Sequence, residues 1–307
     1  MIESGATLVI HPGALGDVLL AIPALRALRV QRPGQPLVLA AQPRLGRLLA
    51  SLGEADRALD FESLGLAALF STGPGRVRPP VLERAARVVC WFGSRDPLFT
   101  ANLRAIVPGA LVAPPATDDV PVWQHLRRTL GAPLEGETKP LHVPLAIAEA
   151  GRQALGQAGW DGVRPVVLLH PGAGNVAKRW PVDGFGLVAR EMSRTVPLAV
   201  AVHDGPADAE AASALMAALG PKTMRLRDPS LETLTGVLAT AAFYLGNDSG
   251  VSHLAAAVGA PSVVLFTSAL FGWRPWGAQA RPLVVSPGGI VAADVERVMA
   301  AARASMA

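Results

Sequence analysis

The most constraining feature of this 307-residue chain is a local pattern that occurs twice. Thr7–His11 is a short apolar run that ends in a glycine-rich turn, Pro12–Asp17, and Val18–Val30 then has apolar residues at helical spacing. Pro165–Leu169 is a second apolar run, typical of a buried parallel strand, and it ends in the turn His170–Asn175. Strands that alternate with helices predict a mostly parallel sheet. We therefore expect two α/β halves, each with its own sheet, and a cleft between them.

Further elements are expected in both halves. The other strand-like runs are Pro36–Ala41, Ala85–Phe92, Leu198–His203, Ala242–Leu245 and Ser262–Phe266. The other helical segments are Pro43–Leu52, Leu145–Ala158, Ala207–Leu219, Glu232–Thr240 and Val251–Val258. Prolines and Gly136 in Leu134–Pro144 predict a linker, because both residue types interrupt regular structure. The expected domains are residues 1–145 and 146–307.

Composition narrows the class of protein. Half of the residues are hydrophobic and 17% are charged, which excludes intrinsic disorder. The formal net charge is +4, too small and too scattered to indicate a nucleic-acid partner, although it fits anionic ligands such as phosphates. Cys90 is the only cysteine, so an intramolecular disulfide and a multi-cysteine metal site are impossible. The chain lacks a secretory signal and an apolar run of about 18 residues, so a cytoplasmic protein is expected.

The first candidate site is the turn that contains Gly13, Ala14, Gly16 and Asp17. Glycines let the backbone approach a ligand closely. An aspartate at the start of a helix is most often an N-cap. A carboxylate in this position can also act as the general base for a substrate hydroxyl. The sequence leaves both roles of Asp17 open.

The second candidate is the segment His170–Pro181. Lys178, one of only three lysines, lies beside Arg179 just past the glycine turn, and two adjacent cations suit a phosphate. The alternative is a solvated basic pair next to a packed Trp180. We expect His170 to be structural or to act behind the residues that touch the ligand. The backbone of the turn is expected to contribute through Gly172, Ala173 and Gly174.

The third candidate lies where an expected strand meets an expected helix, in Leu245–Ala257. Free N–H groups at the start of such a helix, together with its dipole, form a site for a diphosphate. Asp248 is unusual beside phosphates, so it is expected to bond a sugar hydroxyl or to hold the loop together. The residues that this hypothesis assigns to the donor are Asp248, Ser249, Gly250, Val251 and His253.

Several activities lack their motifs. The chain has no G-x-S-x-G elbow, so a serine hydrolase has little support. The absence of G-x-G-x-x-G disfavours a nicotinamide-dependent dehydrogenase. There is no H-E-x-x-H, no D-x-D and no group of His or Cys in sequence, so neither a tightly bound metal nor a cofactor is expected.

Together the three segments resemble glycosyltransferase family 9, the ADP-heptose:lipopolysaccharide heptosyltransferases and their relatives. The resemblance covers about residues 7–270 and depends on three motifs in family order. They are Gly13-Ala14-Leu15-Gly16-Asp17-Val18 with Ile22-Pro23-Ala24-Leu25-Arg26, His170-Pro171-Gly172-Ala173-Gly174 with Lys178-Arg179-Trp180-Pro181, and Gly246-Asn247-Asp248-Ser249-Gly250 with His253-Leu254-Ala255-Ala256.

The resemblance implies a GT-B fold, in which two Rossmann-like domains face each other across a cleft, with the acceptor on the N-terminal side and the nucleotide-sugar donor on the C-terminal side. It also implies inverting, metal-independent transfer of a sugar, most often a heptose, from a nucleoside-diphosphate sugar, ADP-linked in the best-known members. Asp17 occupies the place of the general base, Lys178 that of the lysine that stabilises the donor phosphate, and Asp248 that of the carboxylate near the donor sugar. Ser249, Gly250, Val251 and His253 match the phosphate-binding loop.

The sequence departs from the family pattern at two places. His11-Pro12 stand where many members have an arginine. The segment His203–Asp208 is looser than the usual glycine-rich turn, whose glutamate reaches the donor ribose, and Asp208 is the substitute that we consider.

The resemblance also implies a lipid-linked glycan acceptor of the lipopolysaccharide core or a related surface glycan, and hence a peripheral contact at the inner face of the cytoplasmic membrane. A patch around Arg76, Arg78, Trp91 and Phe92 is one hypothesis for that contact, although Trp91 and Phe92 also fit a core. Two other classes stay open: a nucleotide-sugar epimerase or hydrolase on the same scaffold, and a non-catalytic nucleotide-sugar-binding protein.

Overall fold

The computed structural model describes residues 5–72, 79–134, 138–266, 268–286 and 289–306. It divides into two compact units, Met1–Glu137 and Thr138–Ala307. This division falls before the 145/146 boundary expected from the sequence, because the last part of the expected linker packs with the second unit: the Leu141 N–H donates to the Ala257 carbonyl at 2.8 Å.

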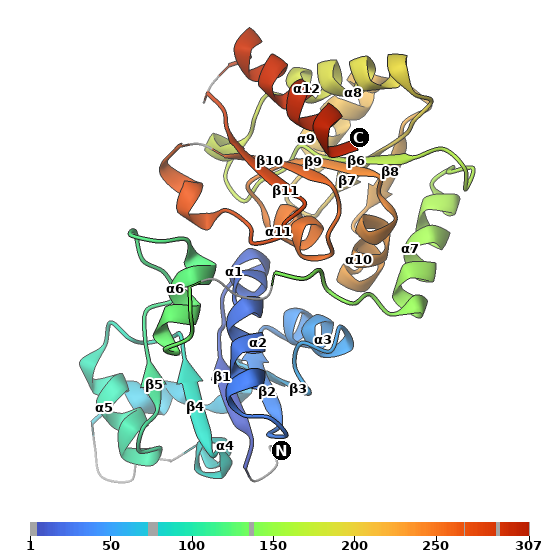
Figure 1. The fold of residues 1–307 in the computed structure, drawn as a ribbon. Coiled ribbons are helices and arrows are strands. Elements are labelled where there is room, and N and C mark those ends of the chain that lie inside the picture. Colours follow the sequence, from blue (N-terminus) through green and yellow to red (C-terminus); the bar gives the residue numbers. More distant parts are fainter. Residues whose placement is uncertain (1–4, 73–78, 135–137, 267, 287–288, 307) are drawn as a thin grey trace. The chain divides into compact units, whose positions relative to one another are not determined.

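Unit 1 is built around a five-stranded parallel sheet of order β3-β2-β1-β4-β5. Figure 1 shows it in blue to green. Its elements are β1 (Thr7–Ile10), α1 (Leu15–Leu20), α2 (Ile22–Gln31), β2 (Leu37–Ala41), α3 (Pro43–Ser51), β3 (Arg57–Asp60), α4 (Pro80–Arg84), β4 (Arg87–Cys90), α5 (Pro97–Ile106), β5 (Leu111–Val112) and α6 (Val122–Thr129). Every residue of β1 and β2 is buried, because apolar side chains on both faces pack beneath helices.

The helix expected over Val18–Val30 is wrong in one respect, because the structure contains two helices there, α1 and α2. The Ala21 N–H bonds the Val18 carbonyl, which ends α1 in a tighter turn. Pro23 has no N–H to continue the hydrogen bonds of α1, but it is tolerated in the first turn of α2. The chain therefore breaks at Ala21 and starts a new helix.

Unit 2 contains a six-stranded sheet of order β11-β10-β9-β6-β7-β8, in which neighbouring strands are parallel. In Figure 1, α8 and α12 lie on one side of this sheet and α10 and α11 on the other. Its elements are α7 (Leu145–Gln157), β6 (Val166–His170), α8 (Val182–Thr195), β7 (Ala199–Asp204), α9 (Ala209–Leu219), β8 (Met224–Arg227), α10 (Leu231–Thr240), β9 (Phe243–Asn247), α11 (Gly250–Ala257), β10 (Ser262–Phe266), β11 (Ala280–Val284) and α12 (Ala292–Met306).

Small residues allow α7 and α10 of unit 2 to pack closely. A Cβ on Gly151 of α7 would lie 2.1 Å from the backbone of Gly236, and a Cβ on Gly236 of α10 would lie 2.0 Å from the Ile147 carbonyl oxygen. The backbones of the two helices therefore touch, which any larger residue at either position would prevent.

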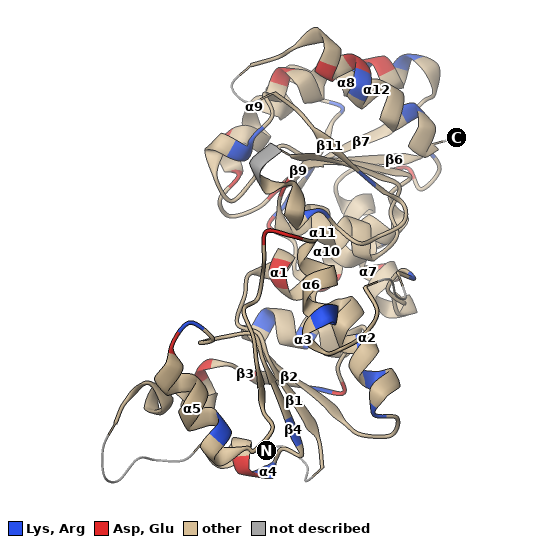
Figure 2. Cartoon of the chain, turned by 60° about the vertical axis from the view of Figure 1, so that its left-hand side comes forward, with Lys and Arg blue, Asp and Glu red and all other residues tan. Residues whose placement is uncertain are grey.

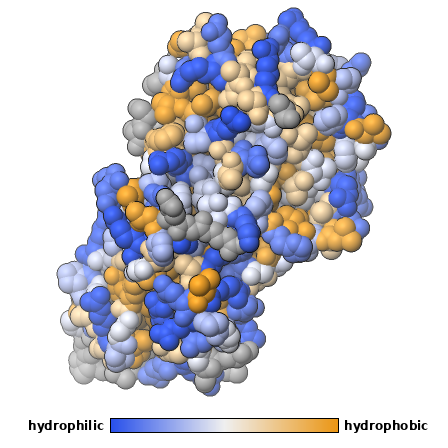
Figure 3. All heavy atoms as spheres, viewed as in Figure 1, coloured by the Kyte–Doolittle hydropathy of each residue, from blue (hydrophilic) through white to orange (hydrophobic). Residues whose placement is uncertain are grey.

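Both sheets have the strand order of Rossmann-like folds, with the first strand in the middle and the chain turning to the other side after the third. Charged residues are scattered over both units (Figure 2). Hydrophobic and hydrophilic residues alternate over the face drawn in Figure 3. Among the described residues, no helix is long and apolar enough to span a membrane.

Candidate active site

In open parallel sheets, ligands bind beyond the carboxyl ends of the strands, where the strand order reverses direction. In unit 2 this point lies between β6 and β9, and in unit 1 it lies between β1 and β4. All three segments that the sequence singled out follow one of these strands. The structure thus brings the second and third candidates together at the carboxyl ends of β6 and β9 in unit 2. The first candidate lies at the carboxyl end of β1 in unit 1.

A lysine and an aspartate connect the two loops of unit 2. Lys178, at the end of the short 3-10 helix η3 (Val176–Lys178), places its Nζ 2.8 Å from Oδ2 of Asp248, which follows β9. The Lys178 side chain is 32% exposed, whereas that of Asp248 is 6% exposed. The Lys178 side chain is therefore partly exposed to solvent, whereas the carboxylate to which it is bonded is buried.

Asp248 has a second basic neighbour in His253 of α11, whose Nε2 lies 3.8 Å from Oδ1. Burial raises the pKa of the Asp248 carboxyl, but the nearby His253 side chain and the hydrogen bond and charge of Lys178 outweigh burial and hold that pKa below its usual range. Asp248 is thus a carboxylate at neutral pH. The sequence suggested that Asp248 bonds a sugar hydroxyl or holds the loop through backbone N–H groups, whereas these contacts are with the side chains of Lys178 and His253.

The buried amide of Asn247, the last residue of β9, fixes the distance between the two loops. Its Oδ1 accepts from the Trp180 N–H at 2.9 Å, and its Nδ2 donates to the Pro171 carbonyl at 2.8 Å. Both ends of the segment that carries Lys178 are therefore attached to β9. Asn247 belongs to one of the sequence motifs, but its positioning role could not be predicted, because nothing local in the sequence shows its hydrogen-bond partners.

The N-terminus of α11 has the form that the third segment predicted. Ser249 is the N-cap, and its Oγ accepts from the Ser252 N–H at 3.3 Å. Gly250 and Val251 form the first turn, whose N–H groups have no acceptor within a helix. Nδ1 of His253 is buried and has no hydrogen-bond partner among the described residues.

The glycine turn after β6 is less uniform than expected. A Cβ on Gly172 would lie 2.1 Å from the Asp208 carboxyl, so only glycine fits there. Ala173 is buried, and its N–H donates a hydrogen bond to the Asp208 carboxyl group. Gly174 is exposed, and a Cβ there would meet open space. The pKa of the Asp208 carboxyl group is raised above its ordinary value, because burial outweighs the effects of the nearby His203 and Arg179, which lower it.

In unit 1, Asp17 lies in the first turn of α1, and its Oδ2 accepts from the Ala14 N–H at 2.9 Å. Asp17 is therefore not the N-cap that the sequence suggested: Ala14 is the N-cap, and Asp17, three residues further on, accepts from its N–H. A Cβ on Gly13 would lie 2.9 Å from Oδ2 of Asp17 and 2.9 Å from Cε1 of His11, so the turn needs glycine there. Gly16 lies within α1.

Beneath this turn lies His11. Its Nδ1 accepts from the Gly13 N–H at 3.4 Å, and its Nε2 is buried without a partner in the described part of the chain. Burial lowers the pKa of His11 to about 4. The imidazole is therefore neutral and supports the turn from below, which the sequence did not indicate.

Unit 1 also contains a cavity of about 790 Å³, in the size range of ligand pockets. It opens at the carboxyl end of β4, the strand that pairs with β1, and Trp91 in its wall makes an edge contact with His11 at 5.7 Å between ring centroids. Its lining is mostly apolar and aromatic: Phe70, Trp91, Phe92, Gly93, Ser94, Arg95, Asp96, Pro97, Leu98 and Pro115.

The hypothesis that Trp91 is part of a membrane-contact patch is wrong, because its side chain is only 1% exposed. Its Nε1 donates to Thr129 Oγ1 at 3.0 Å, and its ring belongs to the interior of unit 1. Phe92 is half-buried against Phe61, Phe70 and Phe99. Arg76 and Arg78 lie outside the described residues.

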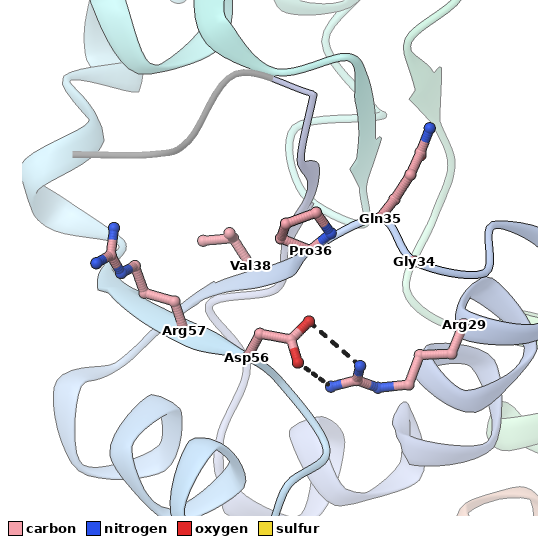
Figure 4. A pocket seen from close by; sticks show the side chains of 7 residues that line it. All are labelled: Arg29, Gly34, Gln35, Pro36, Val38, Asp56 and Arg57. Atoms are coloured by element: carbon pink, nitrogen blue, oxygen red, sulfur yellow. Dashed lines mark hydrogen bonds and ion pairs between the residues drawn. The ribbon is translucent and has the colours of Figure 1, made fainter.

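Another cavity of unit 1, of about 430 Å³, lies at the opposite end of the strands (Figure 4). It is formed where β2 and β3 begin, and Arg29 binds Asp56 in its wall through two hydrogen bonds of 3.0 and 3.2 Å. Because ligands of parallel sheets bind at the carboxyl ends of strands, and because this carboxylate is already paired, we do not assign a substrate to it.

Two units, each with a parallel sheet of this order, are the two Rossmann-like domains of the GT-B fold. A family model described as glycosyltransferase family 9 (heptosyltransferase) matches residues 114–288, more than half of the chain. The chain belongs to this family and is a glycosyltransferase of the heptosyltransferase type.

Solved structures show the same fold. A glycosyltransferase family 9 protein from Veillonella parvula DSM 2008 has a TM-score of 0.78 at 16% identity, over 100% of this chain and 98% of that one. The ADP-heptose lps heptosyltransferase II of E. coli has a TM-score of 0.76 at 20% identity, over 98% of both chains. The E. coli heptosyltransferase WaaC with ADP has a TM-score of 0.66 at 17% identity, over 96% of this chain and 99% of that one. A comparison with curated proteins gives no match.

Proposed function

We propose that this glycosyltransferase transfers a heptose from ADP-heptose, with inversion and without a metal in the transfer step, to an acceptor of the lipopolysaccharide core or a related surface glycan. The observation that carries the proposal is the Lys178–Asp248 pair, which joins the loops after β6 and β9 beside the N-terminus of α11. In a chain of this family, that combination fits a donor diphosphate.

The donor is assigned to unit 2. Its phosphates would lie at the first turn of α11, where N–H groups and the helix dipole favour negative charge. Lys178 supplies a positive charge from the neighbouring loop, and His253 lies one turn into the helix. Structures with the GT-B fold include WaaC with ADP and with ADP-2-deoxy-2-fluoro heptose, which supports ADP-heptose as the donor.

The acceptor is assigned to unit 1. Asp17 follows β1, the aromatic cavity lies at the end of β4, and β1 and β4 are paired strands. Aromatic rings provide flat apolar surfaces for sugar rings, and Arg95 and Asp96 at the cavity wall supply polar contacts. A lipid-linked acceptor would bring the protein to the inner face of the cytoplasmic membrane.

The reaction then needs one base and one stabilised leaving group. Asp17 takes the proton of the acceptor hydroxyl as its oxygen attacks the anomeric carbon. The bond from that carbon to the diphosphate oxygen breaks, and ADP leaves with the electron pair. Attack from the side opposite the diphosphate inverts the anomeric configuration. Lys178 and the amides of α11 stabilise the charge that develops on the leaving group.

Calorimetric titration of the full chain with ADP, UDP and GDP, in EDTA and then in Mg²⁺, tests the donor assignment. We expect selective binding of ADP in EDTA. Incubation with ADP-heptose and a heptose-free lipopolysaccharide core, followed by anomeric analysis of the product by NMR, tests the reaction. An epimerised free sugar or hydrolysis without transfer would favour the alternative enzymes, and ADP binding without turnover would favour a binding protein.

A further inference from the structure

Three potential metal ligands converge at the ends of β6 and β7, on the side of β6 away from β9. They are His170, the last residue of β6, His203 in β7, and Asp208, which precedes α9. One ligand atom from each lies within 4.8 Å of the others. The two Nδ1 atoms are 3.0 Å apart. The sequence showed no such group, because the two histidines are 33 residues apart.

The backbone enforces this convergence. Leu169 of β6 pairs with Val202 of β7, so the next residues, His170 and His203, lie side by side on parallel strands. The loop after β7 then turns back, with the Asp208 N–H donating to the Gly205 carbonyl at 3.0 Å. Two glycines leave room for the carboxyl group: a Cβ would lie 2.1 Å from it at Gly172 and 2.9 Å from it at Gly205.

The surroundings of the group match those of a metal site. His170 is 1% and His203 5% exposed, and the Asp208 side chain is 13% exposed. The two oxygens of Asp208 have different neighbours: Oδ1 lies 3.7 Å from Nη2 of Arg179, and Oδ2 lies 3.9 Å from Nε2 of His170. Carboxylate ligands are commonly oriented in this way, with an outer residue that steadies the group.

We propose that His170, His203 and Asp208 bind one transition-metal ion, with Zn²⁺ as the best match. One ligand atom from each of the three residues lies within 4.8 Å of the others, and Zn²⁺ binds imidazole nitrogen and carboxylate oxygen at about 2.0–2.2 Å. Two imidazoles and one carboxylate are also a frequent ligand set for Zn²⁺ and Fe²⁺. Mg²⁺ is a poor match, because it prefers oxygen ligands in an octahedron.

The ion would join the loop after β6 to the loop after β7 and so brace one side of the donor-binding edge. No step of the proposed transfer goes through it, and its binding can be measured without any nucleotide. Three protein ligands leave one position of a tetrahedral ion open for water or another small ligand. The two imidazoles also share a hydrogen bond between their Nδ1 atoms.

The test uses the full, untagged chain after removal of metals with EDTA and dialysis. Calorimetric titration with Zn²⁺ is expected to show one tight equivalent, and millimolar Mg²⁺ is expected to show none. Co²⁺ in place of Zn²⁺ should give the visible absorption of a four-coordinate site. His203→Gln should weaken Zn²⁺ binding at least about 100-fold, since even partners behind the ligands cost 10- to 100-fold.

The matched control is His142→Gln, which changes an exposed histidine outside the group and should bind Zn²⁺ like the wild type. Asp208→Asn provides a second variant at a less buried position, in case His203→Gln does not fold as judged by circular dichroism. Absence of a tight equivalent in the wild type would overturn the proposal. Equal Zn²⁺ affinity in the wild type and in the folded variants would also overturn it, because the ion would then bind elsewhere.

Discussion

The Nζ of Lys178 lies 2.8 Å from Oδ2 of Asp248, although 70 residues separate them in the chain. The contact holds the lysine side chain at the carboxyl ends of β6 and β9 of unit 2. The diphosphate that we propose to bind there would meet a side chain that is already ordered, which lowers the entropy cost of binding. This relationship leads to the first prediction.

Lys178→Ala should weaken ADP binding by about 10- to 100-fold, because a hydrogen bond to a charged group contributes about 1.5–3 kcal/mol. Calorimetric titration with ADP measures the change. Lys222→Ala removes an exposed lysine elsewhere in unit 2 and should bind ADP like the wild type. If both variants kept the wild-type affinity, Lys178 would have no role at the phosphates.

Asp17→Asn separates the two roles of this residue. The amide oxygen of asparagine can still accept from the Ala14 N–H, but it cannot take a proton, so kcat should fall by about 10²- to 10⁴-fold with unchanged affinity for ADP. Asp17→Ala should in addition lower the unfolding free energy by about 0.5–1.5 kcal/mol, since the hydrogen bond from the Ala14 N–H is lost. Turnover of Asp17→Asn at the wild-type rate would refute the base assignment.

Asn247→Ala should lower the unfolding free energy by about 2–4 kcal/mol, because the Trp180 N–H and the Pro171 carbonyl would lose their buried partner. Urea unfolding followed by circular dichroism gives the value. Asn175→Ala is the control: its side chain accepts from the Ala177 N–H at an exposed position and should cost less than about 1 kcal/mol. Similar losses in both variants would show that Asn247 does not hold the loops.

Phe70→Ala should raise the KM for the acceptor by about 3- to 10-fold and leave ADP affinity unchanged, because this ring is 39% exposed and lines the unit 1 cavity. Steady-state kinetics with varied acceptor concentration measure the effect. Val30→Ala truncates another exposed apolar residue of unit 1, outside this cavity, and should have no effect on KM. An unchanged acceptor KM in Phe70→Ala would place the acceptor elsewhere.

His11 makes the stability of the protein depend on pH. Burial lowers its pKa from 6.5 to about 4, so between these values the unfolded chain binds a proton that the folded chain does not. The contribution of His11 to the unfolding free energy is therefore fully present above pH 6.5. It is lost as the pH decreases to about 4, by up to about 1.4 kcal/mol per pH unit for one such group.

His11→Gln should remove this share and give a flatter dependence of unfolding free energy on pH between 6.5 and 4. Urea unfolding at several pH values, with wild type and variant side by side, measures the difference. His170 and His203 are buried in both proteins, so their contributions cancel in the comparison. Parallel curves for the two proteins would contradict the low pKa of His11.

The strands that the sequence predicted are those in the middle of each sheet. β1, β2 and β4 of unit 1 and β6, β7, β9 and β10 of unit 2 are almost entirely buried and have continuous apolar runs. The missed strands, β3, β5, β8 and β11, are the sheet edges. An edge strand is covered less completely and tolerates polar residues and proline, as Pro282 in β11 shows, so its local pattern is weak.

Local patterns were sufficient for the two parallel α/β units, for the central strands and for the glycine turns that follow them, because burial on both faces leaves a periodic trace in the chain. The same turns located Asp17, Lys178 and the N-terminus of α11, since strand ends and helix starts have characteristic residues.

Only the tertiary structure decided which of these residues meet. The register of β6 with β7 places His170 beside His203, and the adjacency of β6 and β9 lets Asn247 and Asp248 hold the loop of Lys178. Such contacts join residues tens of positions apart, and strand order and register are set by the packing of the whole sheet rather than by any local pattern.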